Sequence, residues 1–213
     1  MGLSLRYATE ADAPTLGHIN VTCFNRQELW GSAYPGLDDE TILPAKAARA
    51  LQKLADPAMH VVVAVETDAP GQPIIGYSRW TIPGAPSPVE LSPTGQDFAG
   101  ADNLPEGANR RVLEGFQAKL KECRKEHLME GDLILDFLAT LPQYQGRGVA
   151  SAMLRWGMEQ AAERRVGIFL EATMDGYALY RKYGWEDVYE VVMEYEPLGG
   201  RGSQRLMLMR RAP

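Results

Sequence analysis

The chain has 213 residues, of which 45% are hydrophobic and 23% charged, and its 22 Lys and Arg against 28 Asp and Glu give a net charge of −6. This composition is typical of a globular protein with a real core and unlike that of a disordered chain. The acidic balance argues against nucleic acid as a partner, and an anionic ligand would need a local positive site. We therefore expect a single domain over residues 1–213 that binds no nucleic acid.

The sequence indicates neither a membrane span nor a disulfide framework. No apolar run approaches the roughly 18 residues of a membrane helix, and the first residues lack a basic-then-apolar signal layout. Cys23 and Cys123 are the only cysteines, and we interpret them as reduced thiols. His18, His60 and His127 share no metal-ligand spacing. We expect a cytoplasmic monomer or homodimer without membrane contact and without metal.

The first part of the chain predicts alternating strands and helices. Alternation over 3–7 predicts a strand, and a capping-box pattern at Thr9 predicts a helix to about Cys23. A turn-rich segment over 25–39 then leads to a helix that begins at Asp39 or Thr41 and ends before Pro57. The β-branched runs over 60–66 and 74–82 predict a hairpin.

An insertion is expected at about 83–131. Residues 83–107 are rich in Pro, Gly and Ser with little periodicity, which predicts irregular structure. The helical stripe that follows predicts an amphipathic helix packed on the domain; its apolar residues are Val112, Leu113, Phe116, Leu120 and Cys123.

The last part of the chain predicts a strand–helix–strand crossover and a hairpin. The nearly continuous apolar run over 132–140 indicates a strand buried on both faces, at the centre of a sheet. We then expect a helix over 148–164, a strand over 166–172, a helix over 175–183, and hairpin strands over 188–195 and 205–209.

The segment that carries chemistry joins the 132–140 strand to the next helix. Gly146 and Gly148 stand where that helix begins, so free backbone N–H groups and the positive end of a helix dipole can meet an anion closely. This favours a pyrophosphate site. It is not a P-loop, because no Gly-Lys-Ser/Thr follows, and Ser151 occupies the third glycine position of the dinucleotide fingerprint.

With these residues the sequence resembles the GCN5-related N-acetyltransferase (GNAT) family. The family's loop Gln/Arg-x-x-Gly-x-Gly/Ala stands here as Gln145-Gly146-Arg147-Gly148-Val149-Ala150, after the fourth strand. A second match is Leu179-Tyr180-Arg181-Lys182-Tyr183-Gly184-Trp185, similar to the family's Leu-Tyr-x-x-x-Gly-Phe. Thr173 and Gly176 depart from the family's usual Asn and Ala.

The resemblance implies an α/β fold with a mixed, mostly antiparallel central sheet, flanking helices, and strands 4 and 5 splayed apart. It implies direct transfer of an acetyl group from acetyl-CoA to a primary amine of a small molecule or peptide, in a ternary complex. Backbone groups of Leu138, Ala139 and Thr140 would pair with the pantetheine arm. The loop and first helical turn would bind the rest of the cosubstrate; these residues are Gln145, Gly146, Arg147, Gly148, Val149, Ala150 and Ser151.

The resemblance also suggests catalytic and acceptor residues, each with a structural alternative. Tyr180 matches the tyrosine that protonates the leaving thiolate, or it is a phenol that packs helix on sheet. Asp136 interrupts an apolar strand and is the candidate to take the amine proton, while Glu171 is a candidate acceptor contact; either carboxylate can instead be a structural ion pair. Trp30 and Tyr34 lie where the family covers its acceptor, or they fill the core.

Two other functions stay open from the sequence. One is a CoA-binding module of this family without catalysis, and the presence of Tyr180 favours the enzyme over it. The other is an acyltransferase that uses a longer acyl group or a hydroxyl acceptor, because the selectivity for chain length depends on packing beside the thioester.

Overall fold

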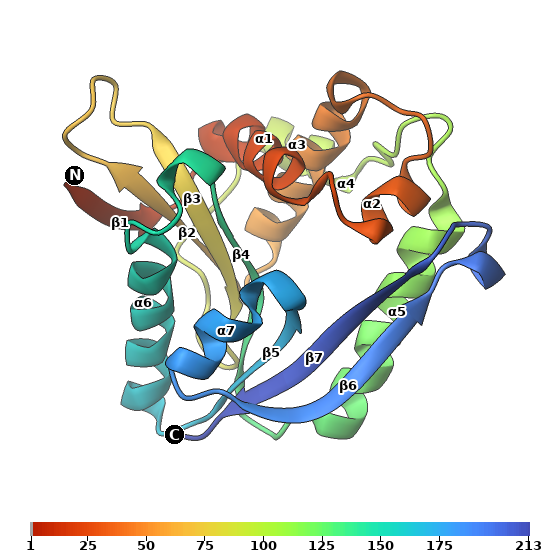
Figure 1. Ribbon diagram of the computed structural model, residues 1–213. Helices are drawn as coiled ribbons and strands as arrows, with labels where there is room; N and C mark the ends of the chain where they lie inside the picture. Colours follow the sequence, from red (N-terminus) through yellow and green to blue (C-terminus); the bar gives the residue numbers. More distant parts are fainter. Residues whose placement is uncertain (1) are drawn as a thin grey trace.

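The computed structural model describes residues 2–213, which form one seven-stranded sheet (Figure 1). The order of the strands across the sheet is β1-β2-β3-β4-β5-β7-β6. The strands are β1 (Leu3–Tyr7), β2 (Met59–Glu66), β3 (Ile74–Thr81), β4 (Leu133–Thr140), β5 (Ile168–Thr173), β6 (Glu186–Glu194) and β7 (Ser203–Arg211).

All neighbouring strands are antiparallel except β4 and β5, which are parallel. The expected mixed, mostly antiparallel sheet is therefore confirmed. The parallel pair is joined by a helix crossover, as parallel neighbours require. In this pair Leu133, Ile168 and Leu170 are at most 1% exposed. Burial on both faces explains why the sequences of both strands are almost entirely apolar.

Helices cover both faces of the sheet (Figure 1). On one face lie α6 (Val149–Arg164) and α7 (Met174–Lys182). There Gly157 has no side chain because the indole of Trp80 fills the space that a Cβ would need. On the other face lie α1 (Ala13–Phe24), after a 3-10 turn at Glu10–Asp12, and α3 (Asp39–Ala55), which pack on β2, β3 and β4.

The segment between β3 and β4 contains two helices. The predicted amphipathic helix is α5 (Arg110–His127), and it runs beside the long β6–β7 hairpin in Figure 1. The irregular stretch expected over 83–107 is interrupted by α4 (Pro93–Gly100), which packs on α3. Ser92 caps α4 by accepting from Gly95 N, and it is itself held by Glu10.

A second short helix, α2 (Glu28–Ala33), lies in the segment that the sequence predicted as turns. It buries Trp30, and its C-terminal neighbour Tyr34 is also buried. A last 3-10 turn, Glu196–Leu198, lies in the β6–β7 connection. No helix within residues 2–213 combines the length and the apolar composition that crossing a membrane requires.

Candidate functional site

The central feature of the site is a separation between β4 and β5. Their pairing ends at Leu135 and Leu170. Beyond that point β4 continues to pair only with β3, up to Thr140, and β5 only with β7, up to Thr173. The two strands therefore diverge, as the family resemblance implied, and leave one edge of β4 without a strand partner from Asp136 to Thr140.

A β-bulge lies where the separation begins. Phe137 is opposite Arg79 and Leu135 is opposite Trp80, so Asp136 has no partner residue on β3. The bulge breaks the alternation of β4, because Asp136 and Phe137 both line the cavity on the α1 and α3 side while Leu135 and Leu138 also contact the α6 side. Bulges turn side chains in this way next to active sites.

A cavity of about 850 Å³ lies over this separation, on the side of α1, α3 and α5. Its walls come from α1, α2, α3, β3, β4, β5, α5 and β7, and from Tyr180 of α7. Because α7 packs on the opposite face of the sheet, the presence of Tyr180 means that the cavity reaches through the gap between the strands. The insertion between β3 and β4 supplies one whole wall, which includes Phe116, Gln117 and Leu120.

The glycine loop after β4 presents free backbone amides. Gly146 and Gly148 have φ of 73° and 84°, and nothing lies within 4 Å of the position of a Cβ on either residue. Within residues 2–213 the N–H groups from Gly146 to Ser151 donate to no protein acceptor; the first amide of α6 that does so is that of Ala152, which binds Gly148 O. Six consecutive amides at the start of a 16-residue helix form a concave site for an anion.

Thr140 connects the strand to this loop. Its carbonyl accepts from Gln145 Nε2 at 3.1 Å and from Cys23 Sγ at 3.4 Å. Its hydroxyl is buried and has no partner in the described part of the chain. A buried hydroxyl without a partner costs free energy, so Thr140 Oγ1 and the free amides fit a polar ligand that runs along β4. Arg147 is exposed beside them, its guanidinium 5.5 Å from the ring centre of Tyr144.

Tyr180 lies at the floor of the cavity and is 9% exposed. Burial raises the pKa of its hydroxyl, so the phenol holds its proton at neutral pH. No group among residues 2–213 hydrogen-bonds to this hydroxyl. Gly176 leaves space for the ring, because a Cβ there would lie 2.9 Å from Tyr180 Cε2. Gly176 thus has a packing reason in this chain.

Asp136 and Glu171 are brought together by a residue that the sequence analysis did not consider. Arg124 of α5 donates to Glu171 through Nε at 2.6 Å and through Nη2 at 2.9 Å, and its Nη1 lies 3.0 Å from Asp136 Oδ1. Asp136 Oδ2 also accepts from Thr81 Oγ1. The two carboxylates raise the pKa of Arg124 further above its ordinary value. This geometry favours the ion-pair interpretation of both acids over the role of a free base.

Trp30 and Tyr34 both line the cavity, and a cation lies on them. Lys46 Nζ is 4.3 Å from the ring centre of Trp30 and 4.7 Å from that of Tyr34. Both rings are nearly buried, at 8% and 6% exposed. They serve at once as core residues and as cavity walls, so the two interpretations from the sequence are compatible.

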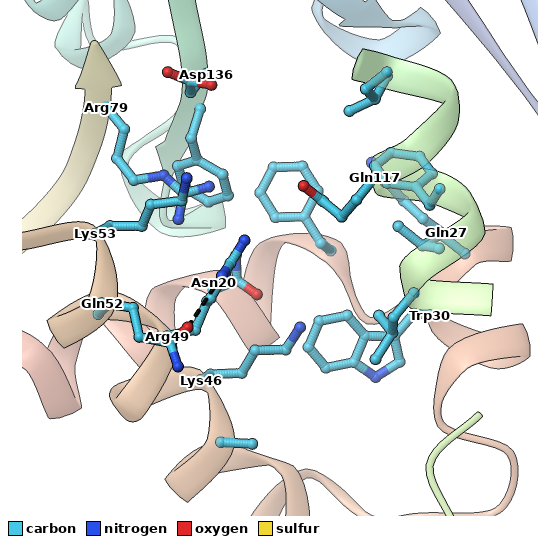
Figure 2. A pocket seen from close by; sticks show the side chains of 18 of the residues that line it. Asn20, Gln27, Trp30, Lys46, Arg49, Gln52, Lys53, Arg79, Gln117 and Asp136 are labelled. Atoms are coloured by element: carbon cyan, nitrogen blue, oxygen red, sulfur yellow. Dashed lines mark hydrogen bonds between the residues drawn. The ribbon is translucent and has the colours of Figure 1, made fainter. Parts of the chain in front are cut away.

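Four cations on the α3 and β3 side of the cavity were missed by the sequence analysis. Lys46, Arg49 and Lys53 project from α3, and Arg79 projects from β3 (Figure 2). The spacing i, i+3, i+7 on α3 was a signal for this face, since such residues stack along one side of a helix. Residues 2–213 contain no group of three or more His, Cys, Asp or Glu side chains arranged to hold a metal ion.

Comparison with known proteins agrees with the fold and the loop. The acetyltransferase (GNAT) domain model matches residues 109–187, which include β4, the glycine loop, α6, β5 and α7. An acetyltransferase from Stachybotrys chartarum is 29% identical over 196 residues, which cover 88% of this chain and 82% of that protein.

Solved structures show the same fold at low identity. The histone acetyltransferase HPA2 and related acetyltransferase from Corynebacterium glutamicum superposes with a TM-score of 0.63 at 19% identity, over 100% of this chain and 97% of that chain. The PaiA N-acetyltransferase from Thermoplasma acidophilum, in complex with coenzyme A, gives 0.52 at 14% identity over the full length of both chains.

Proposed function

The chain is an acetyltransferase of the GNAT family, and from this premise we propose that it moves an acetyl group from acetyl-CoA to a primary amine in a ternary complex. The observation that carries the proposal is one continuous path. It leads from the free amides of the glycine loop, along the unpaired edge of β4, to Tyr180 and the cavity. We further propose that residues 1–213 act as a single catalytic domain, with the segment 83–131 as an insertion that shapes the acceptor side.

The binding of the cosubstrate is assigned to backbone groups. The amides from Gly146 to Ser151 would hold a pyrophosphate, with Arg147 beside them as a further positive charge. Main-chain groups of Leu138, Ala139 and Thr140 would pair with an extended pantetheine arm as with an added strand, and Thr140 Oγ1 would gain a partner. Gln145 orients this corner through its bond to Thr140 O. Val149 and Ala150 complete the first turn of α6.

Acetyl-CoA, when bound, supplies an acetyl thioester whose acyl carbon passes to nitrogen while the sulfur leaves as a thiolate that needs a proton. Tyr180 Oη can hold that proton, because burial keeps the phenol protonated and no other group competes for it. An unpaired N–H of β4 can polarise the acyl oxygen. The N–H comes from β4 and the phenol from α7, the helix that directly follows β5, so the two groups come from the two sides of the gap.

The amine must lose a proton before it attacks. A primary amine with the reference pKa of about 10.4 is ionised at neutral pH, so its neutral form costs roughly 5 kcal/mol there. Asp136 is the proposed acceptor of this proton, although in the free protein it is paired with Arg124 and accepts from Thr81 Oγ1. Glu171 is held even more fully by Arg124 and would orient the acceptor side of the gap.

The test is acetyl transfer over a panel of amines. Release of the CoA thiol and formation of the N-acetyl product are measured together, with acetyl-CoA, a longer acyl-CoA and matched hydroxyl acceptors. Amide formation with acetyl-CoA, equal in amount to the thiol released, is the expected result. CoA binding with no acceptor turned over would favour a binding module, and faster transfer of a longer chain or to a hydroxyl would correct the substrate class.

A further inference from the structure

We propose that the acceptor is an amine that also carries an anionic group, a carboxylate or a phosphate, and that Lys46, Arg49, Lys53 and Arg79 bind this group. The inference rests on the proposed transfer to an amine and names the class of amine. It is carried by the position and the lack of counter-ions of these four side chains, and by the partial burial of Lys46, Lys53 and Arg79; Arg49 is exposed.

The four cations converge on one part of the cavity. Lys46, Arg49 and Lys53 follow one side of α3 at intervals of three and four residues, and Arg79 reaches the same space from β3 (Figure 2). In the same view Gln117 lies on the opposite side of the cavity, and Lys46 reaches the ring of Trp30. An anion at this place would therefore meet positive charge from two independent elements of the fold.

None of these cations has an acidic partner in residues 2–213. No carboxylate oxygen lies within 4.0 Å of their nitrogens, and the one side-chain hydrogen bond among them runs from Arg49 to the neutral Gln52, at 3.0 Å. The other two arginines of the cavity wall are paired: Arg124 with Asp136 and Glu171, and Arg110 with Asp102. In a chain with a net charge of −6, these four unpaired cations, with the exposed Lys121 of α5 also on the cavity wall, indicate a binding site for negative charge.

Two of the cations are desolvated as well as unpaired. Arg79 Nε is buried without a hydrogen-bond partner, and the guanidinium carbon lies 4.5 Å from the ring centre of Phe137. Lys46 lies over Trp30 and Tyr34. Aromatic faces attract a cation but offer no hydrogen-bond acceptor, so a ligand that brings oxygen atoms would give Arg79 Nε the partner that it lacks.

The pKa values of two of these lysines show that their charged forms are destabilised in the cavity. Burial, together with the charges of Arg79 and Arg49, lowers the pKa of Lys46 to about 7 and that of Lys53 to about 8. The acids that act on Lys53, Asp136 and Asp56, oppose this shift only in part. A bound anion would relieve the repulsion and restore the charge of both lysines.

The cations lie close to the reaction centre and apart from the glycine loop. Arg79 is paired in register with Phe137, which stands one residue before the edge of β4 assigned to the pantetheine arm. It lies three residues, or roughly 10 Å, from Thr140 at the start of the loop. A short molecule can thus place its anionic group on Arg79 and its amine at the gap, while the phosphates of the cosubstrate stay on the loop.

The experiment uses acceptors matched in shape and different in charge. They are β-alanine against 3-aminopropanamide, and 2-aminoethyl phosphate against ethanolamine; the two pairs separate a carboxylate from a phosphate. In at least one of the two pairs, we expect kcat/KM to be at least about 10-fold higher for the anionic amine than for its neutral match. The substitutions Arg79→Gln and Lys46→Gln should each lower kcat/KM for that anionic amine by about 10- to 100-fold. The decrease should come mainly from a higher KM, as expected for the loss of a charged hydrogen bond. The neutral match should change little.

Lys125→Gln is the matched control, because Lys125 is exposed on α5 and is not part of the cavity wall. It should leave all four kcat/KM values unchanged. Equal use of acidic and neutral amines by the unaltered protein would overturn the inference. So would an Arg79→Gln protein with weaker CoA affinity and an unchanged KM for the acid, since the cations would then belong to the cosubstrate site.

A failure of the proposed function itself gives a different result. If the protein binds CoA but acetylates no amine, the anion site is tested by binding alone. Succinate and inorganic phosphate are then titrated into the protein by isothermal titration calorimetry. Binding by the unaltered protein that Arg79→Gln weakens at least about 10-fold supports the anion site without transfer. Absence of binding by either probe, or binding that Arg79→Gln leaves unchanged, overturns it.

Discussion

Arg124 binds both carboxylate oxygens of Glu171, at 2.6 and 2.9 Å, although Arg124 comes from the inserted helix α5 and Glu171 from the central strand β5. The same guanidinium also reaches Asp136 on β4. One side chain therefore bridges the two strands at the residues where they begin to separate. The insertion does more than line the cavity, since its Arg124 forms ion pairs with both acids at the gap.

Replacing Arg124 with Met should destabilise the fold. Glu171 and Asp136 would remain as buried, unpaired carboxylates, 6% and 9% exposed, and breaking a buried ion pair from one side costs about 3–5 kcal/mol. Denaturant unfolding monitored by circular dichroism measures the loss, with Lys125→Met as an exposed control on the same helix. A loss below about 1 kcal/mol would contradict the role given to Arg124.

Gly148→Glu should abolish CoA binding. The side chain would enter the open space before the free amides and bring negative charge to a helix N-terminus that favours anions. Gly84→Glu is the matched control, because Gly84 has a similar φ of 72° and equally open surroundings, outside the glycine loop. Both proteins should be folded by circular dichroism, and isothermal titration should detect CoA binding only in the control. Binding by both would refute the assignment of the loop.

The glycine loop and the helix that carries Tyr180 were predicted because their signals are local. Free amides at a helix start follow from Gly146 and Gly148, and the match around Tyr180 to the family's helix end lies within seven residues. The short helices α2 and α4 were missed because six and eight residues are too few for a clear apolar period. Their stability comes from tertiary packing, which local patterns do not contain.

The partners of Asp136 and the charge of the cavity depend on long-range contacts. An ion pair was foreseen as one role of Asp136, but its partner Arg124 lies in an insertion whose path the sequence left open. The sequence predicted α3 as a helix, but not that its cations Lys46, Arg49 and Lys53 form one face of a cavity. Arg79 could be read only as a polar residue in a strand, because the void that it faces exists only after α5 packs.

Gly176→Ala should perturb Tyr180 without harming the helix. The new Cβ would meet the ring edge at 2.9 Å, so the phenol must shift, while Ala favours a helix over Gly. We expect kcat to fall about 10-fold, as for a misplaced catalytic group, with CoA affinity unchanged. Gly100→Ala, where a Cβ meets nothing within 4 Å, is the control and should leave kcat unchanged. An unchanged kcat in Gly176→Ala would show that the ring position does not matter.

Lys46→Met should stabilise the ligand-free protein, and more at pH 6 than at pH 9. The folded pKa of Lys46, about 7, lies below its ordinary 10.5, so unfolding takes up protons between these values and stability rises with pH there. The penalty for a charged Lys46 beside Arg49 and Arg79 is therefore complete below pH 7. Thermal midpoints of both proteins at the two pH values test this. A difference in thermal midpoint between the two proteins that does not depend on pH would show that the charged form of Lys46 is not destabilised in the folded protein.

The most direct measurement is kcat of the Tyr180→Phe protein, at saturating acetyl-CoA and with the amine that gives the highest kcat/KM. The ring stays to pack against Trp185, 6.0 Å away between ring centres, so the thermal midpoint and the KM for acetyl-CoA should change little. Loss of the proton donor should lower kcat by about 10²- to 10⁴-fold. A kcat within about threefold of the unaltered protein, in a folded variant that binds CoA normally, would contradict the account of how this site works.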